Sequence, residues 1–320
     1  MQSNWRPSAD LATLKLRASL LAHAREYFAR SGALEVETPL LVRAAVTDVQ
    51  IESLEVRGPD DRTCGFLHTS PEYAMKRLLA AGSGDIYQIS HVFRGGERGA
   101  RHHPEFTMIE WYRVGSDDRR LMDDVERLVA ELLGGHRPVA AARHVTYNQA
   151  FVDGLGVEPL TASPERLRGA LEHAGIHVPD SVSGDRDALL DLGLSQVVAP
   201  AFPTDRLTFV TQFPASQAAL ARSDGNVAAR FEAFWGALEL ANGFHELGDA
   251  REQSRRFAED RRLRAERGLP DRAPDERLLA ALAAGLPDCA GVALGFDRLV
   301  MIAADRTRID EVLAFTNEHA

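Results

Sequence analysis

The stretch FRGGERGARHHPEFTMIEWY, residues 93–112, decides the fold. It links two segments, 86–94 and 105–114, in which apolar and polar residues alternate as they do along half-buried strands. One face of the first segment carries Gln88, Ser90 and Arg94. One face of the second carries Phe106, Met108, Glu110 and Tyr112. The alternation therefore predicts two adjacent strands joined by a basic loop, with the Glu110 carboxylate among apolar neighbours.

Helical periodicity from Asp10 to Arg30 predicts a long amphipathic helix, with Asp10 as its N-cap and Gly32 as its stop. A second helix is expected from the Ser70-Pro71 pair to Leu79, closed by Gly82. The other expected strands are a short one ending before Pro39, residues 51–58, one ending near His68, residues 207–213, residues 231–246, and one leading through Gly295 into a helix. A charged helix is expected over residues 249–267.

Residues 120–200 carry helical patterns, one of which begins at Ser163-Pro164. We interpret residues 150–205 as a helical insertion in a single domain that spans residues 1–320. Strands and helices do not alternate regularly, so the pattern favours an α+β fold with a mainly antiparallel sheet flanked by helices over a doubly wound parallel one.

Composition excludes several classes of protein. The 320 residues are 45% hydrophobic and 26% charged, which is ordinary globular usage. A net charge of -10 disfavours non-specific binding of nucleic acid or an anionic membrane, and no apolar run is long enough to span a bilayer. Two cysteines, Cys64 and Cys289, exclude a disulfide framework, so a cytoplasmic protein is expected.

Common catalytic motifs are missing, among them the P-loop, HExxH and G-x-S-x-G. Three segments outside these motifs carry chemistry. HTSPEYAMKRLL, residues 68–79, places Glu72 in the first turn of a helix, and residues 93–112 hold Arg94 and Glu110. ELANGFHEL, residues 239–247, spaces two glutamates seven apart, and GVALGFDR, residues 291–298, ends in an arginine. Each of them alone has a plain structural explanation, such as a solvated acid or a packing glycine.

Together, in this order, the segments resemble class II aminoacyl-tRNA synthetases. GALEVETP, residues 32–39, is similar to motif 1, residues 93–112 to motif 2, and GVALGFDR to motif 3. The SPE, PEFTM-x-E-x-Y and ELANGF-x-EL segments resemble the lysyl branch, and FPASQAAL resembles its stand-alone members, which attach (R)-β-lysine to elongation factor P. The resemblance covers the catalytic core, and motif 1 comes so early that we expect no anticodon-binding domain.

The resemblance implies an ATP-dependent ligase that forms an aminoacyl adenylate. Arg94 would hold the α-phosphate of ATP and Arg298 the γ-phosphate, while Glu239 and Glu246 would bind Mg²⁺. Other ATP-binding residues would be Gly95, Gly96, Glu97, His103, Leu240 and Gly295. The substrate pocket would contain Ser70, Pro71, Glu72, Glu110, Tyr112, Glu246 and Ala293, the last standing where lysyl-tRNA synthetases generally have glycine. Several acids in one pocket suit a substrate with two ammonium groups.

The implied second step transfers the lysyl group to a lysine ε-amine of elongation factor P. Two departures from the family stand out: Gly95-Gly96 follows the motif 2 arginine where the family has Asn-Glu, and His103 replaces an asparagine. One alternative is a shortened lysyl-tRNA synthetase, although the acidic net charge disfavours tRNA binding. Another is a regulatory subunit without catalysis. Motif 1 forms a two-fold interface in the class, so a homodimer is expected.

Overall fold

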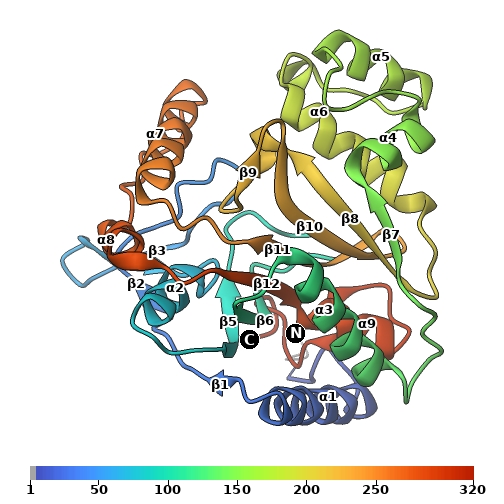
Figure 1. Ribbon diagram of the computed structural model, residues 1–320. Helices are drawn as coiled ribbons and strands as arrows, with labels where there is room; N and C mark the ends of the chain where they lie inside the picture. Colours follow the sequence, from blue (N-terminus) through green and yellow to red (C-terminus); the bar gives the residue numbers. More distant parts are fainter. Residues whose placement is uncertain (1–4) are drawn as a thin grey trace. The chain divides into compact units, whose positions relative to one another are not determined.

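The computed structural model describes residues 5–320. Its internal contacts divide the chain into two compact units. Among the described residues, the first contains 5–115, 247–289 and 293–320, and the second contains 116–246 and 290–292. Each unit is described by itself below, and their elements are labelled in Figure 1. The expectation of a single domain with one insertion and no anticodon-binding domain stays a prediction.

The first unit begins with the long helix α1 (Leu11–Arg30), as predicted. Asp10 is its N-cap and accepts a hydrogen bond from the Thr13 backbone N–H at 2.7 Å. The helix ends at Ser31, and Gly32 then adopts φ +74°, a conformation that glycine reaches without steric cost. Leu20, Ala24 and Phe28 are fully buried on one side of this helix.

Three strands of the first unit pair in the order β1-β5-β6. Their bounds are β1 (Leu34–Glu35), β5 (Ile86–Phe93) and β6 (Glu105–Val114). β1 is parallel to β5, β5 is antiparallel to β6, and Gln88 lies opposite Glu110. Since cross-strand partners share a face, the two alternating segments 86–94 and 105–114 present one combined surface, which confirms the prediction.

A small antiparallel sheet in the same unit has the order β2-β4-β3. Its strands are β2 (Leu41–Val42), β3 (Glu55–Arg57) and β4 (Thr63–Leu67). The expected strand 51–58 was too long. Glu52 leaves this sheet because it forms a backbone bridge to Gly95, while its carboxylate binds the buried Arg264 and Arg272.

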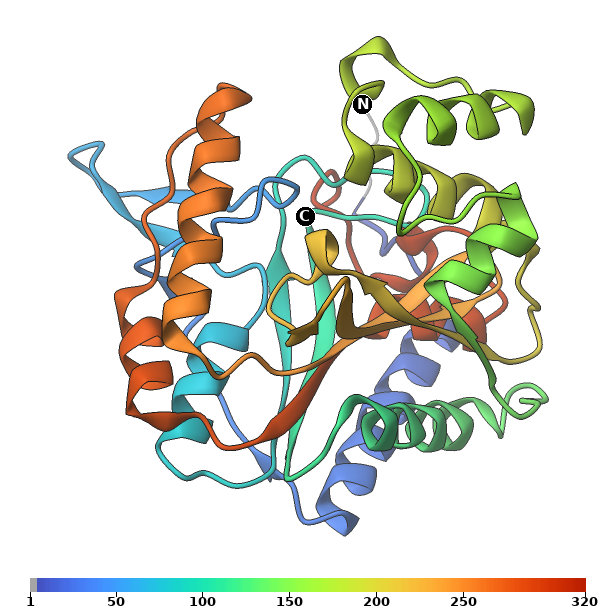
Figure 2. The same cartoon turned by 45° about the horizontal axis from the view of Figure 1, so that its top comes forward.

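The remaining long elements of the first unit are α2 (Glu72–Ala80), α7 (Ala250–Glu266), α8 (Glu276–Gly285), β12 (Cys289–Gly295) and α9 (Phe296–Ala303). Residues 290–292 of β12 are grouped with the second unit. Figure 2 shows α7 and α8 as consecutive orange and red-orange helices, and α8 was not predicted. The N-cap of α2 is Pro71 and not Ser70 as expected, although the Ser70 hydroxyl still accepts from the Glu72 N–H at 3.0 Å.

The second unit combines helices with an antiparallel hairpin. Its elements are α3 (Asp118–Leu133), β7 (Arg143–Thr146), α4 (Tyr147–Leu155), α5 (Pro164–His173), α6 (Arg186–Gly193), β8 (Leu207–Pro214), β9 (Ser223–Asp224), β10 (Val227–Trp235) and β11 (Leu238–His245). The pairing order is β11-β10-β8-β7, and only the β7-β8 pair is parallel. The predicted helical segment is helical, and Ser163 caps α5 as expected.

In the second unit one strand prediction was wrong and the strand β7 was missed. Residues 231–246 form two strands and not one, because Gly236 adopts φ +55° and reverses the chain. The short strand β7 was missed because its pattern is brief and its pairing with β8 is long-range. Within residues 5–320, no helix combines the length and apolar character needed to cross a membrane.

Candidate active site

A cluster of acidic and polar side chains in the first unit, called the acidic pocket below, comes from α2, β6 and the segment between β4 and α2. Glu110 is 2% exposed and accepts two hydrogen bonds at 2.7 Å, from the Ser70 hydroxyl and the Tyr112 hydroxyl. Glu72, the first residue of α2, donates its backbone N–H to Ser70 and pairs its carboxylate with Lys76 at 2.7 Å. The structure thus brings together four residues expected to bind substrate, and Pro71 starts the helix that carries Glu72.

Burial controls the ionisation of this pocket. Loss of contact with water, followed by the negative charge of Glu72, raises the pKa of Glu110 to about 7. The hydrogen bonds from Ser70 and Tyr112 and the charge of Lys76 act in the opposite direction. A cation that entered the pocket would therefore find a carboxylate whose ionised form it can stabilise strongly.

Arg94 lies at the end of β5, on the same face as Glu110. Its guanidinium sits 5.3 Å from the ring centre of Phe106 and 3.6 Å from the Glu97 carboxylate. Its buried Nε has no hydrogen-bond partner among the described residues. Phe106 and Glu110 are four strand residues apart, so their backbone positions are separated by about 13 Å along one face.

The loop after Arg94 is fixed by its first and last residues. The Gly95 N–H donates to the Glu52 carbonyl at 2.7 Å, and Gly96 has φ +77°. At the other end, His103 is 5% exposed, with Nδ1 at 2.6 Å from the Glu105 carbonyl and Nε2 accepting from the Asn317 N–H at 3.3 Å. A polar contact between His103 and a nucleotide would require one of these backbone bonds to break.

Arg298 is the third residue of α9 and reaches the same loop. Its Nη2 lies 2.9 Å from His102 Nε2, and its Nε donates to the Arg101 carbonyl at 3.4 Å. The preceding residue, Asp297, is 1% exposed; it accepts from the Thr107 N–H at 2.6 Å and pairs with Arg17. Sequence reasoning missed the role of Asp297 in holding the start of α9, although an aspartate directly before Arg298 was a visible signal.

Ala293 and Gly295 lie in β12, the strand that leads into α9. Both are partly buried, and Gly295 occupies the N-cap position of the helix. Their place directly before Arg298 is consistent with the expected strand-to-helix motif.

The remaining predicted residues lie in the second unit, on β11 or just after it. Glu239 and Glu246 are seven apart, and an odd separation puts two residues on opposite faces of a regular strand. The pairing of β10 with β11 shifts here: Ala233 faces Ala241, whereas Phe234 faces Glu239. Leu240, which is buried, is therefore the extra residue of a bulge, and the bulge restores a common face to the two glutamates.

Glu232 on β10 is a functional candidate that sequence reasoning missed. It lies opposite Asn242 on the face that also carries Glu239, and Arg230 donates to it at 2.5 Å. Burial raises the pKa of Glu232 to about 7; Arg230 lowers it and Glu239 raises it further. The signal available in the sequence was an acid seven residues before Glu239. It was overlooked because β10 and β11 were predicted as one strand.

Glu246 itself is 1% exposed and is held by its backbone. It forms a bridge with Ala221, and its carbonyl accepts from Arg222 Nε at 2.7 Å. Among residues 5–320, no group of three or more His, Cys, Asp or Glu side chains forms a ready metal cluster. Magnesium is commonly held by only one or two carboxylates together with phosphate oxygens, so the acids on this face fit its chemistry.

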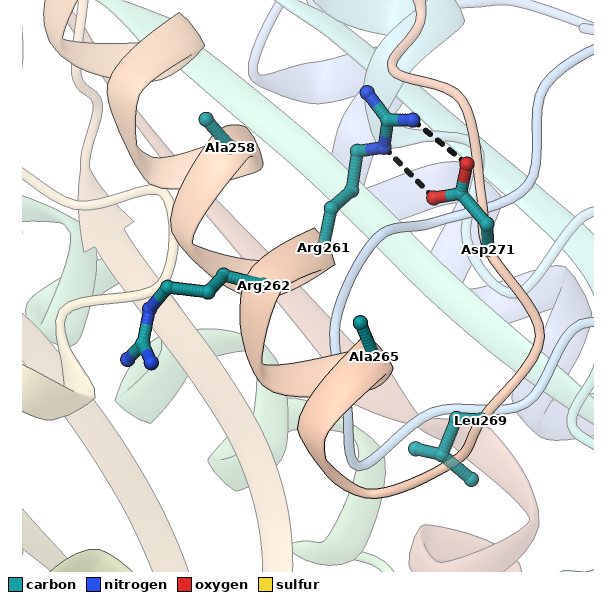
Figure 3. A pocket seen from close by; sticks show the side chains of 6 residues that line it. All are labelled: Ala258, Arg261, Arg262, Ala265, Leu269 and Asp271. Carbon is teal, nitrogen blue, oxygen red and sulfur yellow. Dashed lines mark hydrogen bonds and ion pairs between the residues drawn. The ribbon is translucent and has the colours of Figure 1, made fainter.

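An open recess on α7, drawn in Figure 3, contains none of these residues. Its lining is Ala258, Arg261, Arg262, Ala265, Leu269 and Asp271. Arg261 pairs with Asp271 at 2.6 Å, and Arg262 pairs with Glu259 at 2.6 Å. Because these arginines already have carboxylate partners, the recess offers no strong site for an anion.

The fold and the motif residues define a class II synthetase core. The family of class II tRNA synthetases (D, K and N) matches residues 4–319, and the chain belongs to this family. The α+β fold expected from the sequence is thereby confirmed.

Relatives of the chain with similar sequences carry more specific names. A protein of Salmonella gallinarum (strain 287/91 / NCTC 13346) is 46% identical over 325 residues, which cover 99% of each chain. A protein of Vibrio parahaemolyticus serotype O3:K6 (strain RIMD 2210633) is 48% identical over 322 residues, which cover 98% of each chain. Both are named elongation factor P--(R)-beta-lysine ligase.

Proposed function

We propose that the chain is an ATP-dependent ligase that activates (R)-β-lysine and transfers it to elongation factor P. Its family and the names of its relatives support this activity. The observation that carries the proposal is the acidic pocket, in which the buried Glu110 carboxylate accepts from Ser70 and Tyr112 and lies close to Glu72. Such a pocket disfavours a neutral side chain and suits a substrate with two ammonium groups.

In the first step the carboxylate of β-lysine attacks the α-phosphorus of ATP, and pyrophosphate leaves. No protein nucleophile is needed, so the chain accelerates the step by positioning its substrates and neutralising charge. Arg94 would bind the α-phosphate, since its guanidinium carries a buried N–H with no protein acceptor among the described residues. Arg298 would bind the γ-phosphate, and the loop that includes Gly95, Gly96, Glu97 and His103 would cover the nucleotide.

Glu72 would bind the amine near the reacting carboxylate, and Glu110 the side-chain amine, with Tyr112 orienting Glu110. Ala293 and the Ser70-Pro71 pair would complete this pocket. Glu246, in the second unit, is also proposed to bind substrate. Glu239 and Glu246, together with Glu232, are the residues that would hold Mg²⁺, because they offer carboxylate oxygens on one face of the hairpin. When bound, the ion would offset the negative charge of the phosphates.

In the second step a lysine ε-amine of elongation factor P attacks the carbonyl carbon of the adenylate. The carbon–oxygen bond to AMP breaks, the amine loses a proton and an amide remains. We further propose that the enzyme acts in the cytoplasm as a homodimer and does not use tRNA. The net charge of -10 supports the last point, since tRNA binding depends on neutralising phosphates.

Mass spectrometry of elongation factor P tests the proposal. The factor is incubated with the protein, ATP, Mg²⁺ and (R)-β-lysine, with an Arg94→Ala variant as the matched control; parallel reactions contain tRNA or labelled pyrophosphate in place of the factor. The proposal expects an added β-lysyl mass with the wild-type protein only. Unmodified factor together with aminoacylated tRNA would favour the shortened synthetase, and absence of label exchange between pyrophosphate and ATP would favour a regulatory subunit.

A further inference from the structure

Lys76 is a buried lysine on α2, one helical turn after Glu72. Its side chain is 2% exposed, and its Nζ donates to Glu72 Oε1 at 2.7 Å. Residues four apart lie on the same face of a helix, so Lys76 points to the same side of α2 as the pocket glutamate. A buried ammonium is costly unless it is paired, which makes its charge the feature that needs an explanation.

The positive charge of Lys76 also influences Glu110, which lies on the strand β6. The charged groups of α2 that influence Glu110 are Glu72, which raises the pKa of Glu110, and Lys76, which lowers it. From β6 and the segment before α2, the Tyr112 and Ser70 hydroxyls also lower it by donating hydrogen bonds. From β5, the neutral Gln88 lies opposite Glu110 in the sheet. Lys76 is thus a cation of the first unit whose charge offsets that of the nearby carboxylates Glu72 and Glu110.

We propose that Lys76 is a positioning residue: fixed by its ion pair with Glu72, it supplies a positive charge that favours the ionised form of Glu110 and so extends the pH range of substrate binding to lower pH. The inference rests on the proposed function, which places a diammonium substrate in this pocket. Only the ionised form of Glu110 offers such a substrate a full countercharge. Without Lys76 the two nearby carboxylates would repel each other, and one would take up a proton.

Titration of Glu110 in the ligand-free protein tests the inference directly. Carbon-13 NMR of labelled glutamate carboxyls, with the Glu110 signal assigned by its loss in Glu110→Gln, would be recorded for the wild type and for Lys76→Met. We expect the midpoint for Glu110 to rise by about one pH unit in Lys76→Met, since a nearby opposite charge shifts a carboxyl by that order. Lys76→Arg should restore it, and Arg77→Met, a change at the adjacent exposed residue, should leave it unchanged.

The KM for (R)-β-lysine, measured by pyrophosphate exchange between pH 6 and pH 9, gives a second readout. At pH 7, Lys76→Met should raise this KM about fivefold, because a midpoint that rises from about 7 to about 8 lowers the ionised fraction of Glu110 from about one half to about one tenth; the difference should shrink as the pH rises. The KM for ATP should stay unchanged. A general loss of structure would instead affect both constants at every pH.

If Lys76→Met does not fold, Glu72→Gln is compared with the double variant Glu72→Gln/Lys76→Met. Neither variant contains the Glu72 carboxylate, so neither leaves that carboxylate buried without a countercharge. Glu110 should then titrate at a higher pH in the double variant than in the single one. The inference would be overturned if Glu110 titrated at the same pH in the wild type and in Lys76→Met, or at the same pH in Glu72→Gln and in the double variant. A wild-type protein that exchanges no label with (R)-β-lysine would refute the proposed function, while the NMR titration would still decide the role of Lys76.

Discussion

Replacing Glu110 by glutamine should abolish activity and, at the same time, make the stability of the protein less dependent on pH. The native pKa of Glu110 is about 7 against an ordinary value of 4.5. A carboxyl whose pKa is raised by folding holds its proton more tightly in the native state, so it favours the native state most below pH 4.5. That contribution is lost as the pH rises toward 7. Between pH 5 and pH 8 these two values give a loss of about 2.5 kcal/mol.

Urea unfolding at pH 5 and pH 8 measures this loss. Wild-type protein should lose about 2.5 kcal/mol more unfolding free energy over that interval than Glu110→Gln, because glutamine does not titrate. Glu131→Gln, at an exposed position on α3, is the matched control and should behave like the wild type. In the same preparations, pyrophosphate exchange with (R)-β-lysine should fall by a factor of about 100 or more in Glu110→Gln, since a buried ammonium loses its countercharge.

The reasoning would be refuted if wild type and Glu110→Gln lost equal stability between the two pH values. The carboxyl would then titrate alike in the folded and unfolded chains, and the pocket would not be the desolvated environment that the structure indicates. Unchanged exchange activity in Glu110→Gln would separately refute its role in binding the amine.

Further substitutions test the framework of the site. Arg94→Lys should lower pyrophosphate exchange by about 100-fold or more, because an ammonium cannot bind phosphate oxygens in the fork geometry of a guanidinium; unaltered rates would contradict this. Asp297→Asn should lower the unfolding free energy in urea by about 3 kcal/mol, since it breaks a buried ion pair and weakens the bond to Thr107. Gly243→Ala should cost about 1–3 kcal/mol in the same assay, because its Cβ would lie 2.4 Å from the Phe231 ring, and a neutral effect would show that the ring can move. Chelation of Mg²⁺ should stop pyrophosphate exchange and its re-addition should restore it, whereas activity in excess chelator would exclude the proposed metal dependence.

Much of the first unit was predictable because its signals are local. The cap at Asp10 and the glycine stop bound α1, and strict alternation defines β5 and β6. Alternation also places Glu110 and Arg94 on shared faces, since neither strand contains a bulge in its pairing. The motif residues and their order were sufficient for the family as well, which the comparison confirmed.

What remained hidden depends on contacts between distant segments. Nothing local in Glu52 predicts that it leaves the small sheet for Arg264 and Arg272, more than 200 residues later. Likewise, the identity of the residues around Glu110 does not tell which charges lie close enough to change its ionisation.

The sequence by itself therefore determined the fold class, the acids and arginines available for catalysis, and the order in which they occur along the chain. Only the tertiary structure decided how those acids act. The bulge at Leu240 sets the face of Glu239, and the approach of α2 to β6 sets the charges around Glu110. The physical reason is that side-chain periodicity follows from backbone geometry within one element, whereas strand register and electrostatic environment arise only when separate elements pack together.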